Sequence, residues 1–81
     1  MYKIDITLNA QEELEAAEAH YSQISEKVSE KFIDTVFKTY FILEINPHLR
    51  VWYKNNHAIA LSKFPYLLFY EIDEENKIVT I

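Results

Sequence analysis

The sequence predicts an α+β fold: an N-terminal strand, a helical hairpin and a three-stranded antiparallel meander, in the order β-α-α-β-β-β, with the helices packed on one face of the sheet. Three observations support this prediction. Polar and apolar residues alternate from residue 2, apolar residues recur every three or four positions from residue 10 to residue 45, and short β-prone runs follow. The chain has 81 residues, of which 49% are hydrophobic, so we expect one domain over residues 1–81.

The first strand is predicted over residues 2–8. Its apolar members share one side of the strand, and they are Tyr2, Ile4, Ile6 and Leu8. Asn9 and Glu12 have the spacing of a helix N-cap and its capping-box partner, which places the start of the first helix at Asn9. This helix is expected to bury one narrow apolar stripe, made of Ala10, Leu14, Ala17, Tyr21 and Ile24.

The second helix is predicted over residues 26–45, with Ser25 as its N-cap. Two apolar stripes run along it. One consists of Val28, Phe32, Val36, Tyr40 and Leu43, and the other of Ile33, Phe37 and Phe41. More than half of the helix circumference is therefore apolar and needs cover on two sides. The sheet and the first helix can supply that cover, or part of the apolar surface receives a partner protein.

Three further strands are predicted after Asn46-Pro47, which ends the helix because the residue before proline is pushed out of the helical region. They span residues 57–61, 67–72 and 77–81. Residues 51–53 add an aromatic, β-prone run before a tight turn at Asn55-Asn56. The chain contains no glycine, so we expect asparagine, aspartate and proline to make every turn.

The net charge of −5 is unevenly distributed along the chain. Residues 1–46 hold nine acids and four lysines, whereas residues 47–66 hold no acid and three basic residues, Arg50, Lys54 and Lys63. This basic segment is either a functional surface or a strand-rich region that simply carries few charges. A nucleic-acid-binding domain is usually basic throughout, so the composition disfavours RNA or DNA as the principal partner.

Composition also disfavours cofactors and membranes. The chain has no cysteine, and its three histidines lack the spacing of metal ligands, so we expect no metal site and no cofactor. No apolar run approaches the roughly 20 residues of a membrane span, and the first residues do not have the pattern of a signal peptide. We therefore expect a cytoplasmic, soluble protein with no membrane partner.

The segment Lys63-Phe64-Pro65-Tyr66 joins two predicted strands, and Tyr70 stands four residues beyond it. Taken with the helical hairpin, Asn46-Pro47 and the segment Trp52-Tyr53-Lys54-Asn55, this order and spacing resembles the RelE/ParE toxin superfamily of bacterial type II toxin-antitoxin systems. The resemblance spans the whole chain. It implies a small cytoplasmic toxin that inhibits growth, serves plasmid stabilisation and is neutralised by a cognate antitoxin.

One branch of this superfamily cleaves mRNA on the ribosome, with basic residues at the positions that best match Ala58, Ala60 and Leu67. RNA cleavage needs a base, an acid and cations for the phosphate, and three apolar side chains supply none of these. The chain therefore lacks catalytic groups at these three positions, although the question whether it is an enzyme stays open. The alternative is a ribosome-dependent mRNA endoribonuclease that uses other side chains, namely Arg50, Lys54, His57 or Lys63.

The Phe64-Pro65-Tyr66 form of the turn is more similar to the ParE-like branch, which binds DNA gyrase and performs no chemistry of its own. The candidate target-contacting residues are Arg50, Lys54, His57 and Lys63. Many members of that branch have an arginine where this chain has His57, and they extend the last strand beyond Ile81. We therefore expect the last strand to be curtailed. The alternative that the toxin is inactive for this reason stays open.

The resemblance also implies how the antitoxin binds: with a helix in a groove beside the helical hairpin and with an extended segment along the sheet. The candidate groove residues are Phe37, Tyr40 and Phe41, although the pattern favours a place in the core for each of them taken singly. A curtailed strand would leave an exposed sheet edge, and such an edge favours self-association.

Overall fold

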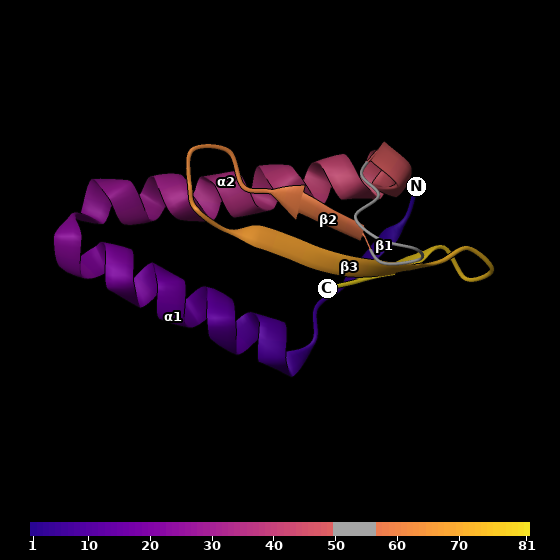
Figure 1. Ribbon diagram of the computed structural model, residues 1–81, viewed down its shortest axis with the longest axis horizontal. Helices are drawn as coiled ribbons and strands as arrows, with labels where there is room; N and C mark the ends of the chain where they lie inside the picture. The colour runs from indigo at the N-terminus through magenta and orange to yellow at the C-terminus, as the bar shows by residue number, and fades with distance from the viewer. Residues whose placement is uncertain (50–56) are drawn as a thin grey trace.

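The computed structural model describes residues 1–49 and 57–81. The predicted β-prone run at residues 51–53 and the turn Asn55-Asn56 lie outside these residues. The elements are β1 (Lys3–Asp5), α1 (Leu8–Ile24), α2 (Glu26–Ile45), the short 3-10 helix η1 (Pro47–Leu49), β2 (His57–Ala60), β3 (Leu67–Asp73) and β4 (Ile78–Thr80). The predicted α+β fold and its element order are thus confirmed (Figure 1).

The four described strands form one mixed sheet in the order β1-β4-β3-β2. Strands β2, β3 and β4 form the predicted antiparallel meander. The N-terminal strand joins the meander beside its last strand and runs parallel to it, with Ile4 opposite Val79. Parallel neighbours need a long crossover connection, and the helical hairpin is part of it. Strand β4 is therefore central, and β1 and β2 are the outer strands of the described sheet.

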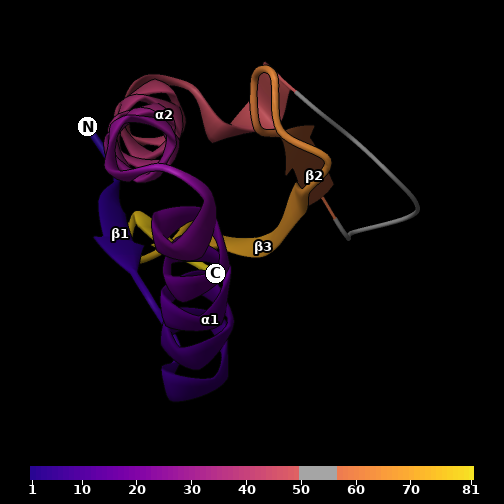
Figure 2. The same ribbon diagram turned by 90° about the vertical axis from the view of Figure 1, so that its left-hand side faces the viewer.

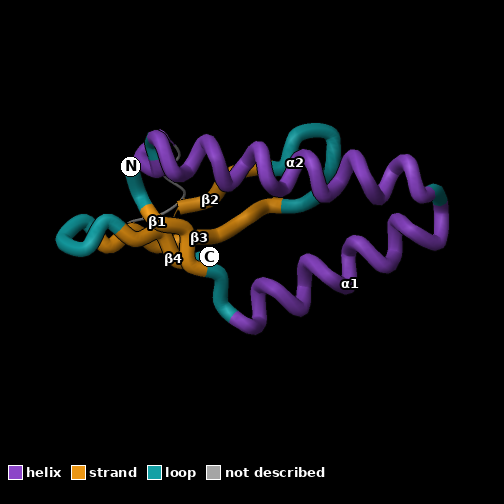
Figure 3. Tube along the Cα trace, turned by 180° about the vertical axis from the view of Figure 1, so that it is seen from behind, coloured by secondary structure: helices purple, strands orange, loops and turns teal. Residues whose placement is uncertain are grey.

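The two helices form a V, and the sheet lies between its arms (Figures 1 and 3). Helix α2 covers one face of the sheet, and α1 packs mainly against α2 near the junction of the two helices. Towards its N-terminus α1 diverges from α2, as the view turned by 90° also shows (Figure 2). A groove lies between α1 and β3, and residues of both elements line it.

Helix α1 begins two residues earlier than the sequence predicts. Its N-cap is Thr7, whose Oγ1 accepts a hydrogen bond from the Ala10 amide at 3.2 Å, so the prediction of Asn9 as the cap is wrong. The reason is tertiary: the Thr7 hydroxyl also donates to the carbonyl of Ile81 at 2.8 Å, which fixes it in the capping position. The predicted strand shortens accordingly, and Leu8 lies in the helix with its side chain exposed.

The break between the helices is where the sequence predicts it. The Ser25 hydroxyl accepts from the Val28 amide, and the Ser25 amide donates to the Tyr21 carbonyl, so one residue ends α1 and begins α2. Helix α2 has the predicted bounds. Ile24, however, is exposed, because it lies in the last turn of α1 where the chain reverses.

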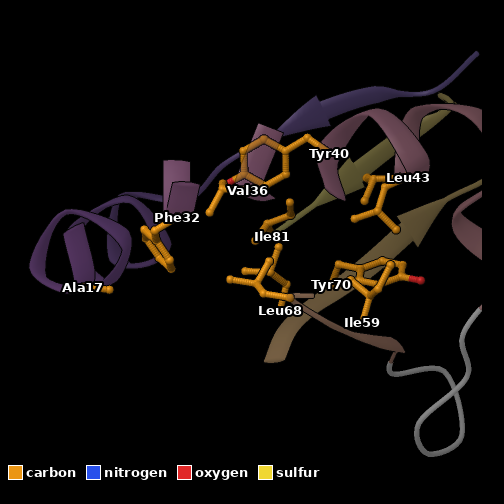
Figure 4. Close-up of a cluster of buried hydrophobic side chains, with 11 residues drawn as sticks. Ala17, Phe32, Val36, Tyr40, Leu43, Ile59, Leu68, Tyr70 and Ile81 are labelled. Carbon is orange, nitrogen blue, oxygen red and sulfur yellow. The ribbon is translucent and has the colours of Figure 1, made fainter. Parts of the chain in front are cut away.

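The core lies between α2 and the inner face of the sheet (Figure 4). Phe32, Leu43 and Val79 are completely buried. They join side chains of both helices, of β2 and β3, and of the residues that directly follow β2 and β4: Ala17, Val36, Tyr40, Ile59, Leu61, Leu68, Tyr70 and Ile81. Burial raises the pKa of the Tyr40 phenol, whose oxygen has no hydrogen-bond partner among the residues that the structure describes.

Two turns use lysine where the backbone is left-handed. Lys63 has φ 69° and Lys77 has φ 56°. The expectation that asparagine, aspartate and proline make every turn is therefore wrong. A left-handed conformation costs a residue with a Cβ roughly 1–2 kcal/mol, because the Cβ approaches the following carbonyl. Both turns thus carry a local cost that tertiary packing offsets.

We expect Lys63→Gly to raise the free energy of unfolding by about 0.5–1 kcal/mol, because relief of the left-handed strain exceeds the extra chain entropy of glycine. Urea denaturation followed by circular dichroism measures the change. Lys31→Gly is the control, since it places glycine inside α2 and should cost about 1 kcal/mol. Equal destabilisation by both substitutions would contradict the account of the turn.

Candidate protein-binding surfaces

The turn between β2 and β3 is anchored to the helical hairpin by aromatic rings. The Phe64 ring lies 5.1 Å from the Tyr21 ring and 5.2 Å from the Phe32 ring, both edge-on. Tyr66 adds a third contact, 5.8 Å from Phe32. A hydrogen bond from the Leu61 amide to the Tyr66 carbonyl closes the turn. The turn is therefore held rigidly over α1 and α2, and Lys63 is exposed within it.

The three positions that match the basic residues of the RNA-cleaving branch share one face of the β2–β3 hairpin. Ala60 lies directly opposite Leu67, and Ala58 is two residues away on the same strand, opposite Phe69. This face is opposite to the one that carries the core residues Ile59 and Leu68, and it is apolar at all these positions. Ala60 and Leu67 are exposed on it, whereas Ala58 is buried.

Of the four candidate target-contacting residues, the structure describes His57 and Lys63, and it places these two apart. His57 begins β2, is half-buried and stacks on Tyr70 with ring centroids 5.2 Å apart. Lys63 lies beyond the opposite end of β2. Arg50 and Lys54 lie outside the described residues. His57 and Lys63 are thus separated by the whole length of the strand.

A polar cluster that the sequence did not reveal lies at the end of the sheet where β1 begins. The Tyr2 hydroxyl donates to both carboxylate oxygens of Glu74, at 2.9 and 3.0 Å. His48 Nε2 bonds the same carboxylate, and Lys77 Nζ reaches it at 3.2 Å. The His48 ring also lies edge-on to His57 at 6.3 Å. The parallel pairing of β1 with β4 brings Tyr2 and Lys77 together, and sequence periodicity does not report such pairing.

Glu74 should make the free energy of unfolding depend on pH in the acidic range. The hydrogen bond from Tyr2, followed by those from Lys77 and His48, holds the pKa of this carboxyl below its ordinary value of 4.5. A carboxyl with a depressed folded-state pKa stabilises the fold above its unfolded-state pKa, and this contribution is lost as the pH falls through the folded-state value. We expect Glu74→Gln to destabilise the protein near neutral pH and to lose less further stability on acidification than the unchanged chain.

Urea midpoints measured from pH 7 down to about pH 3 check this expectation. Tyr2→Phe removes the largest cause of the shift and should fall between the unchanged chain and Glu74→Gln. Parallel loss of stability in all three proteins would show that Glu74 is not the linked group.

The outer side of α2 carries exposed aromatic side chains. Phe37 is 64% exposed and Phe41 is 57% exposed, one turn apart on the same face, with Ile45 a further turn along. Tyr40, the third candidate groove residue, is 8% exposed and belongs to the core. The structure therefore leaves Phe37 and Phe41 exposed and directs Tyr40 inward.

A shallow groove of about 510 Å³ runs beside the helical hairpin. Its apolar floor includes Ile33 and Phe37. Its acidic lining consists of Glu18, Glu26, Glu30 and Asp34. A helix that offered apolar and basic side chains would complement this groove.

A larger groove of about 670 Å³ lies between α1 and β3. Leu14 and Ala17 of α1 line one wall, Leu67 and Leu68 of β3 line the other, and Ile81 also lines the groove. The sequence could not reveal it, because it depends on how far α1 diverges from the sheet.

Residues 1–49 and 57–81 contain no group of three or more side chains arranged to hold a metal ion. In the same part of the chain, no helix combines the length and apolarity that crossing a membrane requires.

The fold and these surfaces define a small α+β protein whose prominent features are apolar grooves and exposed aromatic side chains, which are properties of a protein-binding domain. A family model described as the ParE toxin of the type II toxin-antitoxin system, parDE, matches residues 4–81, and the chain belongs to this family. It is thus a toxin of the toxin-antitoxin type, a class that implies an antitoxin partner. No curated protein and no solved structure matches the chain.

Proposed function

We propose that the chain acts by binding a protein target of the DNA gyrase type and is neutralised by an antitoxin bound over the helical hairpin. Membership of the ParE toxin family supports this proposal. The observation that carries it is the apolar outer face of the β2–β3 hairpin, where Ala58, Ala60 and Leu67 offer no group for acid–base chemistry or phosphate binding.

The antitoxin would use the exposed side of α2. Phe37 and Phe41 have the spacing of anchor residues for a helix laid in a groove, and large aromatic side chains are favoured as interface hot spots. The acidic lining beside Phe37 adds charge selectivity for a basic helix face. The target would instead contact the basic segment from Arg50 to Lys63.

Expression of the chain alone in bacterial cells tests the toxic function. Growth should stop, and co-expression of the adjacent antitoxin gene should restore it. Unimpaired growth, with soluble folded protein present, would contradict the toxic function. Binding of the antitoxin in that case would identify a protein that sequesters the antitoxin without being toxic.

A second candidate is the ribosome-dependent mRNA endoribonuclease, which the neighbouring imidazoles of His48 and His57 favour. Two imidazoles can supply both the acid and the base that strand cleavage needs, and Glu74 would orient one of them. Primer extension on mRNA after induction would reveal codon-linked cuts, which His57→Asn should abolish. Absence of cuts in growth-arrested cells would exclude this candidate.

A further inference from the structure

The turn between β2 and β3 is held in a strained conformation. The Phe64 amide donates to the Leu61 carbonyl at 3.3 Å, which makes Lys63 the third residue of a β-turn. A positive φ at this position favours glycine or asparagine, yet Lys63 has φ 69°. A strained residue persists only where its surroundings hold it, and such residues gather in segments that switch between conformations. The turn therefore has a relaxed conformation available once its surroundings release it.

Aromatic contacts with both helices hold the turn. The Phe64 ring contacts Tyr21 of α1 and Phe32 of α2. Tyr66 contacts the same two rings, with centroids 6.3 and 5.8 Å away. Phe32 is completely buried, so it cannot move without disturbing the close-packed core, whereas Tyr21 is half-buried at the edge of the core. The conformation of the turn therefore depends on where α1 holds Tyr21.

Helix α1 has room to move. It packs mainly on α2 near the junction of the two helices, and the groove of about 670 Å³ separates its middle from β3 (Figure 3). Two hydrogen bonds join Thr7 to the carbonyl of Ile81 and fix the N-terminal end of α1, so a shift of its other end is a small rotation. Tyr66 lines the same groove and is 38% exposed, which leaves its ring space to turn away from Tyr21.

The shallow groove beside the helical hairpin reaches the same junction. Glu18 and Ser22 of α1 line it, together with Ser29 of α2. The Ser22 hydroxyl donates to that of Ser29 at 2.9 Å and bridges the two helices. Tyr21 directly precedes Ser22 in the chain. A side chain that enters between Ser22 and Ser29 must therefore shift α1 and carry the Tyr21 ring with it.

We propose that the β2–β3 turn is a two-state switch controlled from the groove beside the helical hairpin. An apolar side chain of the antitoxin enters between the helices, shifts α1 and withdraws Tyr21 from Phe64. Lys63 then relaxes from its left-handed conformation, although it does not line the groove itself. Because the coupling is reciprocal, whatever stabilises the left-handed turn weakens antitoxin binding. The switch rests on the proposed function, since the antitoxin is its ligand.

Three uncharged substitutions of Lys63 test this coupling, because they differ in how well they accept a positive φ. Lys63→Gly accepts it freely, Lys63→Gln accepts it about as poorly as lysine, and Lys63→Val disfavours it most, since valine is β-branched. Calorimetric titration with the purified antitoxin should give about two- to fivefold weaker binding by Lys63→Gly than by Lys63→Gln. Lys63→Val should bind at least about twofold more tightly than Lys63→Gln, which is the matched control for the lost charge.

Two tryptophan variants test the switch without the antitoxin. Ser22→Trp fills the groove from within, whereas Gln23 is exposed on the same helix outside it. In Ser22→Trp the nuclear Overhauser contact between the rings of Tyr21 and Phe64 should disappear, and in Gln23→Trp it should remain. The same contact should disappear when the unchanged chain binds the antitoxin. Circular dichroism establishes that each variant is folded, and Ser22→Leu takes the place of a variant that does not fold.

Three results would overturn the switch. They are equal antitoxin affinity of the three Lys63 variants, tightest binding by Lys63→Gly, and persistence of the contact between Tyr21 and Phe64 in folded Ser22→Trp.

Failure of the antitoxin site gives a different result. Undiminished antitoxin binding after replacement of both Phe37 and Phe41 by aspartate would remove the antitoxin from the helical hairpin and contradict the proposed function. The tryptophan variants would still report whether filling of the groove releases the turn, because they need no antitoxin.

Discussion

Replacement of Phe32 by alanine is expected to lower the free energy of unfolding by about 3–5 kcal/mol. Phe32 is completely buried at the junction of α2 with the β2–β3 turn, where its ring meets those of Tyr21, Phe64 and Tyr66. Truncation removes the transfer free energy of the ring and leaves a cavity that rigid neighbours cannot fill. A domain of this size has roughly 4–12 kcal/mol of total stability, so one substitution removes a large part of it.

Urea denaturation followed by circular dichroism measures this loss. Phe41→Ala is the matched control, because the same atoms are removed from an exposed position of the same helix and the cost should stay near 0.5 kcal/mol. If Phe32→Ala does not fold, Phe32→Leu keeps most of the volume and should lose about 1.5 kcal/mol or less. Similar stability of Phe32→Ala and Phe41→Ala would contradict the position assigned to Phe32.

The double substitution Phe37→Asp with Phe41→Asp is expected to weaken antitoxin binding by about 100-fold or more, since each aromatic anchor of an interface is worth about 2 kcal/mol. Both rings are exposed, so the two aspartates create no buried charge and should cost the free protein only the weaker helix propensity of aspartate. Calorimetric titration with the purified product of the adjacent antitoxin gene measures the effect.

Lys31→Asp controls for the added negative charge, because it changes the charge of α2 by the same two units on a different face of the helix. It should leave antitoxin affinity within a few-fold of the original value. In cells, the double variant should arrest growth even when the antitoxin is present. Full rescue of growth by the antitoxin, with undiminished affinity, would remove Phe37 and Phe41 from the interface.

The sequence predicted the structural features that depend on residues close together in the chain. The bounds of α2 follow from the Ser25 cap and the proline after Asn46, and both act within a few residues of the helix end. The meander likewise follows from short β-prone runs between turns. The sequence did not decide whether Phe37 and Phe41 are exposed or buried. A helix with two apolar stripes does not reveal which of its faces the rest of the fold covers.

Long-range contacts account for what the sequence did not predict. Thr7 displaces Asn9 as the cap because the carbonyl of Ile81, 74 residues away, holds its hydroxyl. Strand β1 runs parallel to β4, and this pairing also assembles the cluster around Glu74. Lys63 adopts a left-handed conformation directly before Phe64, in a turn that the aromatic contacts of Phe64 and Tyr66 fix.

Supercoiling of relaxed plasmid DNA by purified DNA gyrase, with and without the purified chain, tests the central claim most directly. The proposed function predicts dose-dependent inhibition, which prior addition of the antitoxin relieves and which Lys63→Glu weakens. Undiminished supercoiling at concentrations of folded chain that stop growth would contradict binding of gyrase as the mode of action.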